Sequence, residues 1–267
     1  MKERLDQLLV EQGFFETRER AKRAIIEGIV AVEGYQHLKP GTRIDENAKI
    51  TIKDKKRIFP YVSRGGLKLK KALEEFQIIV KDKVALDIGA STGGFTDCLL
   101  QFGAMKVYAV DVGYGQFDWK LRNDSRVVLR ERVNARYLTR EVVPEDVDIV
   151  VMDVSFISVS KIIPSVLSFL KDEGDIIILV KPQFEAGKED VGKGVIRDSK
   201  IHKKVIKSVL DRCVEFSLGF LGLTWSPIKG PKGNMEFLLW CKKGIKCTLN
   251  IEEYINRVVE EAHRKLD

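Results

Sequence analysis

The chain has 267 residues, and 44% of them are hydrophobic, which suffices for one large domain or for a small and a medium one. No apolar run approaches the ~18 residues of a membrane helix, and the charged start, residues 1–6, has no apolar signal core. Four cysteines without C-x-x-C pairing and three distant histidines indicate neither a disulfide framework nor a metal site. We therefore expect a cytoplasmic protein with reduced thiols, no bound metal and no association with a membrane.

The formal net charge of +7 is concentrated near the amino terminus. Residues 1–71 carry 17 Lys or Arg and 10 Asp or Glu, whereas the remaining residues carry 29 of each. A basic module in front of a neutral domain suggests an appendage that binds a polyanion. A solvated basic surface is also common in small domains, so charge alone does not decide between the two interpretations.

The first module, residues 1–58, is predicted to contain two helices and a small hairpin. Apolar residues at helical spacing precede a stop at Gly13, and Thr17 can cap a second, arginine-rich helix that ends at Gly28. The pattern from Arg4-Leu5-Asp6 to Lys39-Pro40-Gly41 resembles the S4 RNA-binding domain. This resemblance implies phosphate contacts that position structured RNA without selecting a base. The candidate RNA-binding residues here are Arg4, Arg18, Arg20, Lys22 and Arg23.

Residues 59–64 are predicted to link this module to a second domain, residues 65–267. A helix is expected to run from Ser63, or from the glycine pair that follows, to Phe76, because apolar residues recur at helical spacing. Arg64, at the start of this helix, is a further candidate for contact with RNA.

Residues 85–97 are the most informative segment of the chain. An apolar run contains Asp87, small residues fill positions 89–94, and a second strand, 106–110, ends at Asp111. An acid at that point can accept hydrogen bonds from both hydroxyls of a ribose. The loop reads G-x-x-x-G-G, so it does not match the dinucleotide-binding fingerprint. The loop resembles instead the S-adenosylmethionine motif of Rossmann-type methyltransferases. The alternative interpretation is an ordinary turn of another α/β domain. The candidate cofactor-binding residues are Asp87, Gly89, Ala90, Ser91, Thr92, Gly93, Gly94, Phe95, Thr96, Asp111, Asn134 and Asp153.

Charged residues stand at the ends of several further strands, which are predicted at 126–129, 147–152, 175–180 and 237–240. Together with a lysine before the first strand, they resemble the Lys-Asp-Lys-Glu tetrad of ribose 2′-O-methyltransferases. The candidate catalytic residues are Lys68, Asp153, Lys181 and Glu236. Any one of them could be a surface charge, but four at matching positions favour the catalytic interpretation.

The expected chemistry explains these residue types. A ribose 2′-hydroxyl is a weak acid, so a base must take its proton as the oxygen attacks a sulfonium methyl group in line. Lys181 could be that base if a second ammonium group, Lys68, and partial burial favour its neutral amine form. Asp153 and Glu236 would orient the lysines, and no metal is required because the attack neutralises charge.

Other motifs narrow the reaction. The [DN]-P-P-[YF] pattern of amino-group methyltransferases is absent after the fourth strand, and no cysteine stands where a cytosine-C5 methyltransferase needs its nucleophile.

The glycine-rich segment 185–198 is expected to be a mobile flap that contacts the substrate, or else a solvated loop. Its candidate RNA contacts are Lys188, Lys193 and Arg197.

Along nearly its whole length the chain resembles the TlyA (hemolysin A) family, on the segments 63–69, 87–96, 153–158, 181–185 and 192–198. The resemblance implies an α/β fold: a Rossmann-like class I methyltransferase domain, with a seven-stranded, mostly parallel sheet and helices on both faces, preceded by a small α+β S4-like domain. It also implies an S-adenosylmethionine-dependent enzyme that methylates cytidine ribose in 16S or 23S rRNA, or both. The expected partners are 30S and 50S subunits, one or both, and the expected state is a monomer.

Three other functions stay open at this point. The word hemolysin in the family name suggests a membrane-active cytolysin as one alternative, although the sequence contains no segment that could span a membrane. A non-catalytic ribosome-binding factor would keep the cofactor fold and bind RNA without methyl transfer. A small-molecule methyltransferase would leave the S4-like module without a purpose.

Overall fold

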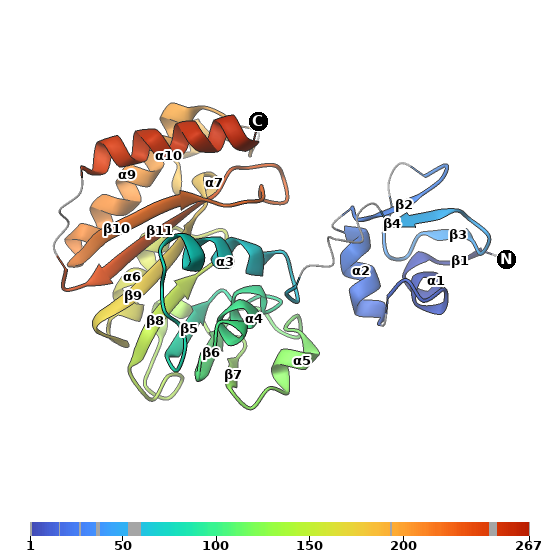
Figure 1. The fold of residues 1–267 in the computed structure, drawn as a ribbon, viewed down its shortest axis with the longest axis horizontal. Helices are drawn as coiled ribbons and strands as arrows, with labels where there is room; N and C mark the ends of the chain where they lie inside the picture. The colour runs from blue at the N-terminus through green and yellow to red at the C-terminus, as the bar shows by residue number, and fades with distance from the viewer. Residues whose placement is uncertain are drawn as a thin grey trace. The chain divides into compact units, whose positions relative to one another are not determined.

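The computed structural model describes residues 2–15, 17–26, 28–35, 38–52, 60–192, 194–245 and 250–266, without the side chains of Glu19, Arg20, Arg23, Ile26 and Lys188. The chain divides into two compact units, unit 1 at residues 1–59 and unit 2 at residues 60–267 (Figure 1). The boundaries of the predicted linker, residues 59–64, stay a prediction, and Phe59 lies outside the described residues.

Unit 1 contains two helices and two short antiparallel strand pairs. The elements are β1 (Lys2–Arg4), α1 (Leu5–Glu11), α2 (Arg18–Ile26), β2 (Val30–Val32), β3 (Arg43–Asp45) and β4 (Ile50–Ile52). Strand β1 pairs with β3, and β2 pairs with β4. The helices cover a small apolar core, which includes Leu5, Leu9, Ala21, Ile25 and Ile44. The predicted single hairpin was therefore incomplete, because strands β1 and β3 are three residues long and mainly charged, with Ile44 as their one apolar residue.

Unit 2 is built around one seven-stranded sheet. Its strands are β5 (Val84–Ile88), β6 (Lys106–Val110), β7 (Val127–Arg130), β8 (Val147–Met152), β9 (Leu170–Val180), β10 (Leu218–Trp225) and β11 (Phe237–Lys243). They lie in the order β10-β11-β9-β8-β5-β6-β7. Strands β5 to β9 pair in parallel, and β11 runs antiparallel to both β9 and β10. The predicted seven-stranded, mostly parallel sheet is confirmed.

Helices cover both faces of this sheet (Figure 1). They are α3 (Gly65–Glu75), α4 (Gly94–Gln101), α5 (Trp119–Arg122), α6 (Ile163–Leu167), α7 (Pro182–Glu185), α8 (Lys188–Val191), α9 (Ser199–Glu215) and α10 (Ile251–Leu266), with 3-10 turns at Ala135–Tyr137 and Val159–Lys161. Side chains of strand β8 show the two layers: Val150 and Met152 pack with α6, α9 and α10, whereas Ile149 and Val151 pack with α3 and α4. Burial on both faces explains why the central strands are continuous apolar runs.

The strand order brings residues distant in sequence to one edge of the sheet. The chain leaves β5 toward β7 and returns to β8 on the other side of β5, which creates the switch point where α/β folds bind ligands. Register pairs join Ile88 with Met152, Met152 with Ile178, and Val180 with Phe237. Because β11 is antiparallel, its first residue lies at the edge where the parallel strands end. None of the helices among the described residues is both long and apolar enough to cross a membrane.

Candidate active site

At two glycines of the loop after β5, the backbone lies so close to neighbouring residues that a side chain would not fit. A Cβ on Gly89, where φ is +82°, would lie 2.6 Å from the carbonyl oxygen of Asp153, and a Cβ on Gly93, where φ is +93°, would lie 2.4 Å from Leu121. Gly93 is also the N-cap of helix α4. The small residues predicted to form a cofactor loop therefore form a tight turn at the amino end of a helix.

Asp87 is buried completely beneath this loop. Its Oδ2 accepts a hydrogen bond from Thr96 Oγ1 at 2.6 Å, while its Oδ1 is buried without a partner among the described residues. Burial raises the pKa of Asp87 to about 7, the Thr96 hydrogen bond opposes this rise, and the nearby Asp153 and Asp111 carboxylates add to it. An acid with an open acceptor oxygen is suited to a cationic ligand group.

Asp111, at the end of β6, is tied to the loop by backbone donors. Its Oδ2 accepts a hydrogen bond from Ser91 N at 2.7 Å, and its Oδ1 accepts one from Gly113 N at 2.6 Å and one from Gln116 Nε2 at 3.2 Å. Ser91 adopts a φ of +50° to make this contact. The acid predicted to bind a ribose is thus held in a fixed position beside the loop.

The four predicted catalytic residues form two ion pairs. Lys68 Nζ donates to Glu236 Oε2 at 2.6 Å, and Lys181 Nζ lies 2.5 Å from Asp153 Oδ1. Lys68, Lys181 and Glu236 are buried, and Asp153 keeps 21% of its side chain exposed. The charges of the two lysines and two carboxylates balance, which allows them to be buried together.

The two pairs influence each other electrostatically. Burial acts to raise the pKa of Asp153, but the ammonium groups of Lys68 and Lys181, and more weakly the Arg64 guanidinium, outweigh it and leave this pKa below its ordinary value. Asp153 therefore stays ionised at neutral pH. Arg64, predicted to contact RNA, belongs to the electrostatic surroundings of this cluster.

The segments that follow β8 and β9 are fastened together by contacts that the sequence did not reveal. Lys181 Nζ donates to Ser155 Oγ at 2.8 Å, and Glu185 accepts hydrogen bonds from Ser158 Oγ at 2.6 Å and from Val159 N at 2.8 Å. The rings of Phe156 and Phe184 lie 4.9 Å apart. Burial raises the pKa of Glu185, with partial compensation from its two hydrogen bonds. Glu185 thereby fixes the loop that carries Asp153.

The remaining predicted residues lie in several places. Asn134 is exposed, and its Oδ1 accepts from Arg136 N at 3.0 Å, so it caps a short turn. Arg197 is exposed before α9. Arg4 and Arg18 both bind the Asp6 carboxylate, and Lys22 is half-buried on α2. Lys193 and the side chains of Arg20, Arg23 and Lys188 lie outside the described residues.

The predicted flap, residues 185–198, is partly fixed. It contains the last residue of α7 and the whole of α8. Its later part is anchored by Asn234, which donates to the Gly194 carbonyl at 2.9 Å and accepts from Ile196 N at 2.9 Å. Within the described residues no group of three or more His, Cys, Asp or Glu side chains is arranged to hold a metal ion.

The fold and the site define a Rossmann-type methyltransferase preceded by an S4-like unit. Residues 61–243 match the FtsJ-like methyltransferase family, and residues 3–50 match the S4 domain. The chain belongs to the FtsJ-like methyltransferase family.

Proteins that are similar to this chain over nearly its whole length narrow the family assignment. YqxC of Bacillus subtilis, named as a candidate rRNA methyltransferase, is 52% identical over 99% of this chain and 95% of its own. The 16S/23S rRNA (cytidine-2′-O)-methyltransferase TlyA of Mycobacterium tuberculosis is 42% identical over 97% of each chain. A solved structure of a candidate hemolysin from Streptococcus thermophilus is 45% identical, covers 99% of this chain and 96% of that chain, and has a TM-score of 0.79. The resemblance to the TlyA (hemolysin A) family is confirmed.

Gly89→Ala is expected to weaken binding of S-adenosylmethionine by about tenfold or more, because a Cβ there would push the Asp153 backbone away. Gly115→Ala is the matched control, since Gly115 also has a positive φ, +74°, but has nothing within 4 Å. Calorimetric affinities of the two variants check the prediction. Equal losses would assign the effect to backbone strain instead of crowding.

Glu185→Ala is expected to lower kcat for methyl transfer by about 10- to 100-fold, because the loop that carries Asp153 would lose its anchor. Glu185→Gln should retain most of the activity, since its side chain can accept from Val159 N and donate to Ser158 Oγ. Steady-state kinetics with a thermal melt of each variant check this. Similar kcat values for the Ala variant and the unchanged protein would contradict the proposed anchoring.

Proposed function

We propose that this protein transfers a methyl group from S-adenosylmethionine to the 2′-hydroxyl of cytidine in ribosomal RNA, within 30S subunits, 50S subunits or both. The observation that carries the proposal is the pair of buried lysine–carboxylate contacts, Lys68–Glu236 and Lys181–Asp153, next to the glycine-rich loop. The names of relatives that match almost the entire chain supply the substrate.

The residues around the loop fit the cofactor. Asp87 offers a buried acceptor oxygen to an ammonium group, Asp111 offers a carboxylate to ribose hydroxyls, and Gly89 and Gly93 leave room for close approach to the backbone. The bound cofactor supplies a sulfonium methyl group as the electrophile. The same contacts support a role in cofactor binding for the residues from Gly89 to Thr96. Asn134 would contribute to cofactor binding through the short turn that it caps.

The chain's own residues would manage the proton of the ribose hydroxyl. Lys181 Nζ, once it has released its own ammonium proton to solvent, accepts the proton of the hydroxyl, and Ser155 Oγ and Asp153, which both contact Nζ, hold the amine in place. Lys68, fixed by Glu236, places a second ammonium group beside the site and lowers the pKa of Asp153. Burial limits access of water to the reacting groups.

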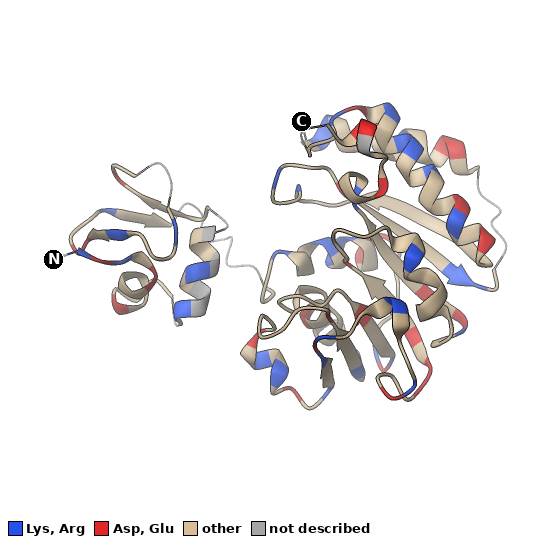
Figure 2. Ribbon diagram, turned by 180° about the vertical axis from the view of Figure 1, so that it is seen from behind, with Lys and Arg blue, Asp and Glu red and all other residues tan. Residues whose placement is uncertain are grey.

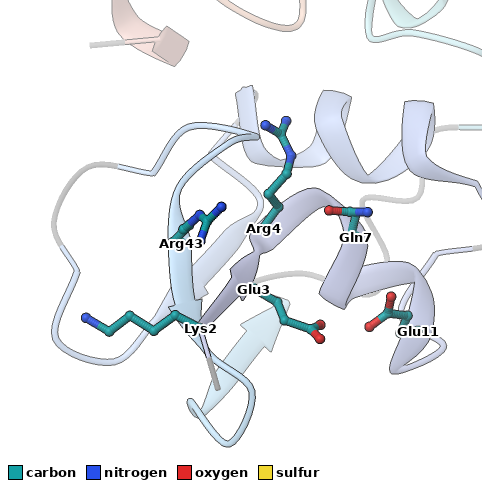
Figure 3. Close-up of a pocket in the computed structure, with 6 residues that line it drawn as sticks. All are labelled: Lys2, Glu3, Arg4, Gln7, Glu11 and Arg43. Carbon is teal, nitrogen blue, oxygen red and sulfur yellow. The ribbon is translucent and has the colours of Figure 1, made fainter.

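Unit 1 would bind the RNA. Lys and Arg residues lie on β1, β3 and α2 (Figure 2 and Figure 3), and such residues attract phosphates in a salt-dependent way. We assign further RNA contacts to Lys188, Lys193 and Arg197. In this proposal residues 1–58 are the RNA-binding domain, residues 59–64 the linker and residues 65–267 the catalytic domain. The protein acts as a monomer in the cytoplasm.

Lys181→Ala is expected to reduce methyl transfer by about 10²–10⁴-fold, because the base is removed, while leaving binding of the cofactor and of RNA in place. Lys161→Ala, which removes an exposed lysine, is the control. Tritium transfer from labelled S-adenosylmethionine to separated 30S and 50S subunits that lack the modification measures the effect. Label in an alkali-resistant dinucleotide supports ribose methylation, whereas label on a base would overturn the role of the tetrad.

Binding of S-adenosylmethionine is expected to release a proton below about pH 7. The raised pKa of Asp87 means that the free protein holds a proton there, and a cationic ligand favours the ionised form. Affinity should therefore fall as the pH drops below about 7, by at most tenfold per pH unit. Calorimetry in buffers of different ionisation enthalpy measures the released protons, and Asp87→Asn should abolish the release. Equal release by this variant would exclude Asp87 as its source.

A further inference from the structure

Two acceptors of different charge contact the side-chain nitrogen of Lys181. Its Nζ donates to Ser155 Oγ at 2.8 Å and lies 2.5 Å from Asp153 Oδ1, and only 9% of the Lys181 side chain is exposed. Asp153 stays ionised, because neighbouring cations and its hydrogen bond with Lys181 hold its pKa below the ordinary value. Ser155, in contrast, is exposed and uncharged. The residues that the structure describes offer Nζ no third hydrogen-bond partner.

The number of acceptors matters once Lys181 is an amine. An ammonium group has three N–H donors and no acceptor. Loss of one proton leaves two N–H donors and one lone pair, and only the lone pair can accept a proton. Asp153 and Ser155 can engage both remaining N–H groups, so the lone pair is directed away from both acceptors. A substrate hydroxyl that lies in that direction meets a lone pair and not a hydrogen atom.

The segment that carries Ser155 is fixed against the residues that follow β9. The Phe156 ring lies 4.9 Å from the Phe184 ring. Glu185 accepts a hydrogen bond from Val159 N at 2.8 Å. Phe156 has a φ of +64°, which is unfavourable for an aromatic residue and persists only where the surroundings fix it. These contacts hold the backbone next to Ser155, and with it the place of the hydroxyl.

A hydroxyl is the acceptor that suits this position. A second carboxylate here would favour the ammonium form of Lys181 and oppose its use as a base. A methyl group would accept nothing, and the amino group could then rotate about the Cε–Nζ bond with one N–H still on Asp153. The lone pair would then face the substrate in only part of the molecules. Serine restrains this rotation without adding charge.

We propose that Ser155 is a positioning residue for methyl transfer: its hydroxyl accepts one N–H of the neutral Lys181 amine and thereby directs the lone pair of Nζ toward the ribose 2′-hydroxyl. The inference rests on the proposed function and adds to it the orientation of the base. In the transfer step the ribose oxygen forms a bond to the methyl group, the methyl–sulfur electron pair remains with sulfur, and the hydroxyl proton moves to the lone pair of Nζ. Ser155 exchanges no atom and acts only through Lys181.

Steady-state kinetics of the complete chain on rRNA subunits test the role of the hydroxyl. Ser155→Ala should lower kcat about tenfold, because the amine is directed correctly in fewer molecules, while KM for the subunits and the affinity for S-adenosylmethionine stay unchanged. Ser155→Thr retains an acceptor and should restore most of kcat. Ser168→Ala is the matched control, because Ser168 is also exposed but donates to the Ser165 carbonyl at 2.9 Å. An unchanged kcat of Ser155→Ala, or an equal loss in the Thr variant, would overturn the positioning role.

The pH dependence of kcat distinguishes a contact with the base from a structural role of Ser155. Ser155→Asp keeps an acceptor but adds a negative charge beside Nζ, so the midpoint of the rise of kcat with pH should move upward by about one pH unit or more. Ser155→Asn adds no charge and should leave the midpoint in place. The other charged groups around this contact are the same in both variants; they are Asp153, Lys68, Glu236, Arg64 and Asp87. Equal midpoints of the Asp and Asn variants would contradict the proposal.

A measurement without RNA distinguishes failure of this inference from failure of the proposed function. If the unchanged protein transfers no methyl group to either subunit, the proposed function fails. Rotation of the Lys181 amino group about the Cε–Nζ bond, measured by relaxation of a nitrogen-15 label at Nζ, still reports the restraint, and Lys181→Arg assigns the signal. Faster rotation in Ser155→Ala than in the unchanged protein supports the restraint by Ser155, and equal rates overturn it.

Discussion

The mutual neutralisation of four charges, three of them buried, is the constraint on which unit 2 depends. Lys68 and Glu236 are 168 positions apart in the chain, and their contact fixes helix α3 against the start of β11. Lys181 and Asp153 likewise join the ends of two neighbouring strands. Removing one member of such a pair leaves an uncompensated buried charge, which costs about 3–5 kcal/mol. The arrangement that we propose for proton transfer therefore also joins the layers of the domain.

A similar relation exists on a smaller scale in unit 1. Asp6 is buried because Arg4 and Arg18 compensate its charge, and the two arginines are oriented because Asp6 is buried. In both units an ion pair between distant elements fixes the packing of the elements that carry it. The removal of one charge would therefore disturb the position of its partners in either unit.

Much of the catalytic domain could be predicted from the sequence because its central strands are buried on both faces. The strands at 106–110 and 147–152 were predicted with their observed bounds, since apolar runs end abruptly at charged residues. The predicted strand at 126–129 is displaced by one residue, and 175–180 is the second half of the longer β9. Helix α9 and strand β10 were not assigned.

Contacts between segments that follow different strands could not be predicted. The hydrogen bond between Glu185 and Ser158 forms because β8 and β9 are neighbours in the sheet. No local sequence pattern predicts that these two strands are neighbours. Arg18 was predicted to face RNA from its position on a basic helix, but its contact with Asp6 requires the packing of α1 against α2. Residue types at strand ends indicate the chemistry, whereas the supporting contacts follow from the strand order.

The antiparallel last strand has a consequence for the order in which the domain is completed during synthesis. A nascent chain that has been made as far as Lys181 already contains the glycine-rich loop, Asp111, and both members of the Lys181–Asp153 pair. The counter-ion of Lys68 is missing until residue 236 has been added, because Glu236 directly precedes β11. Domains fold largely as units as they emerge from the ribosome. The ammonium group of Lys68 thus gains its partner only when the final third of the chain docks, so the neutral tetrad requires the complete domain.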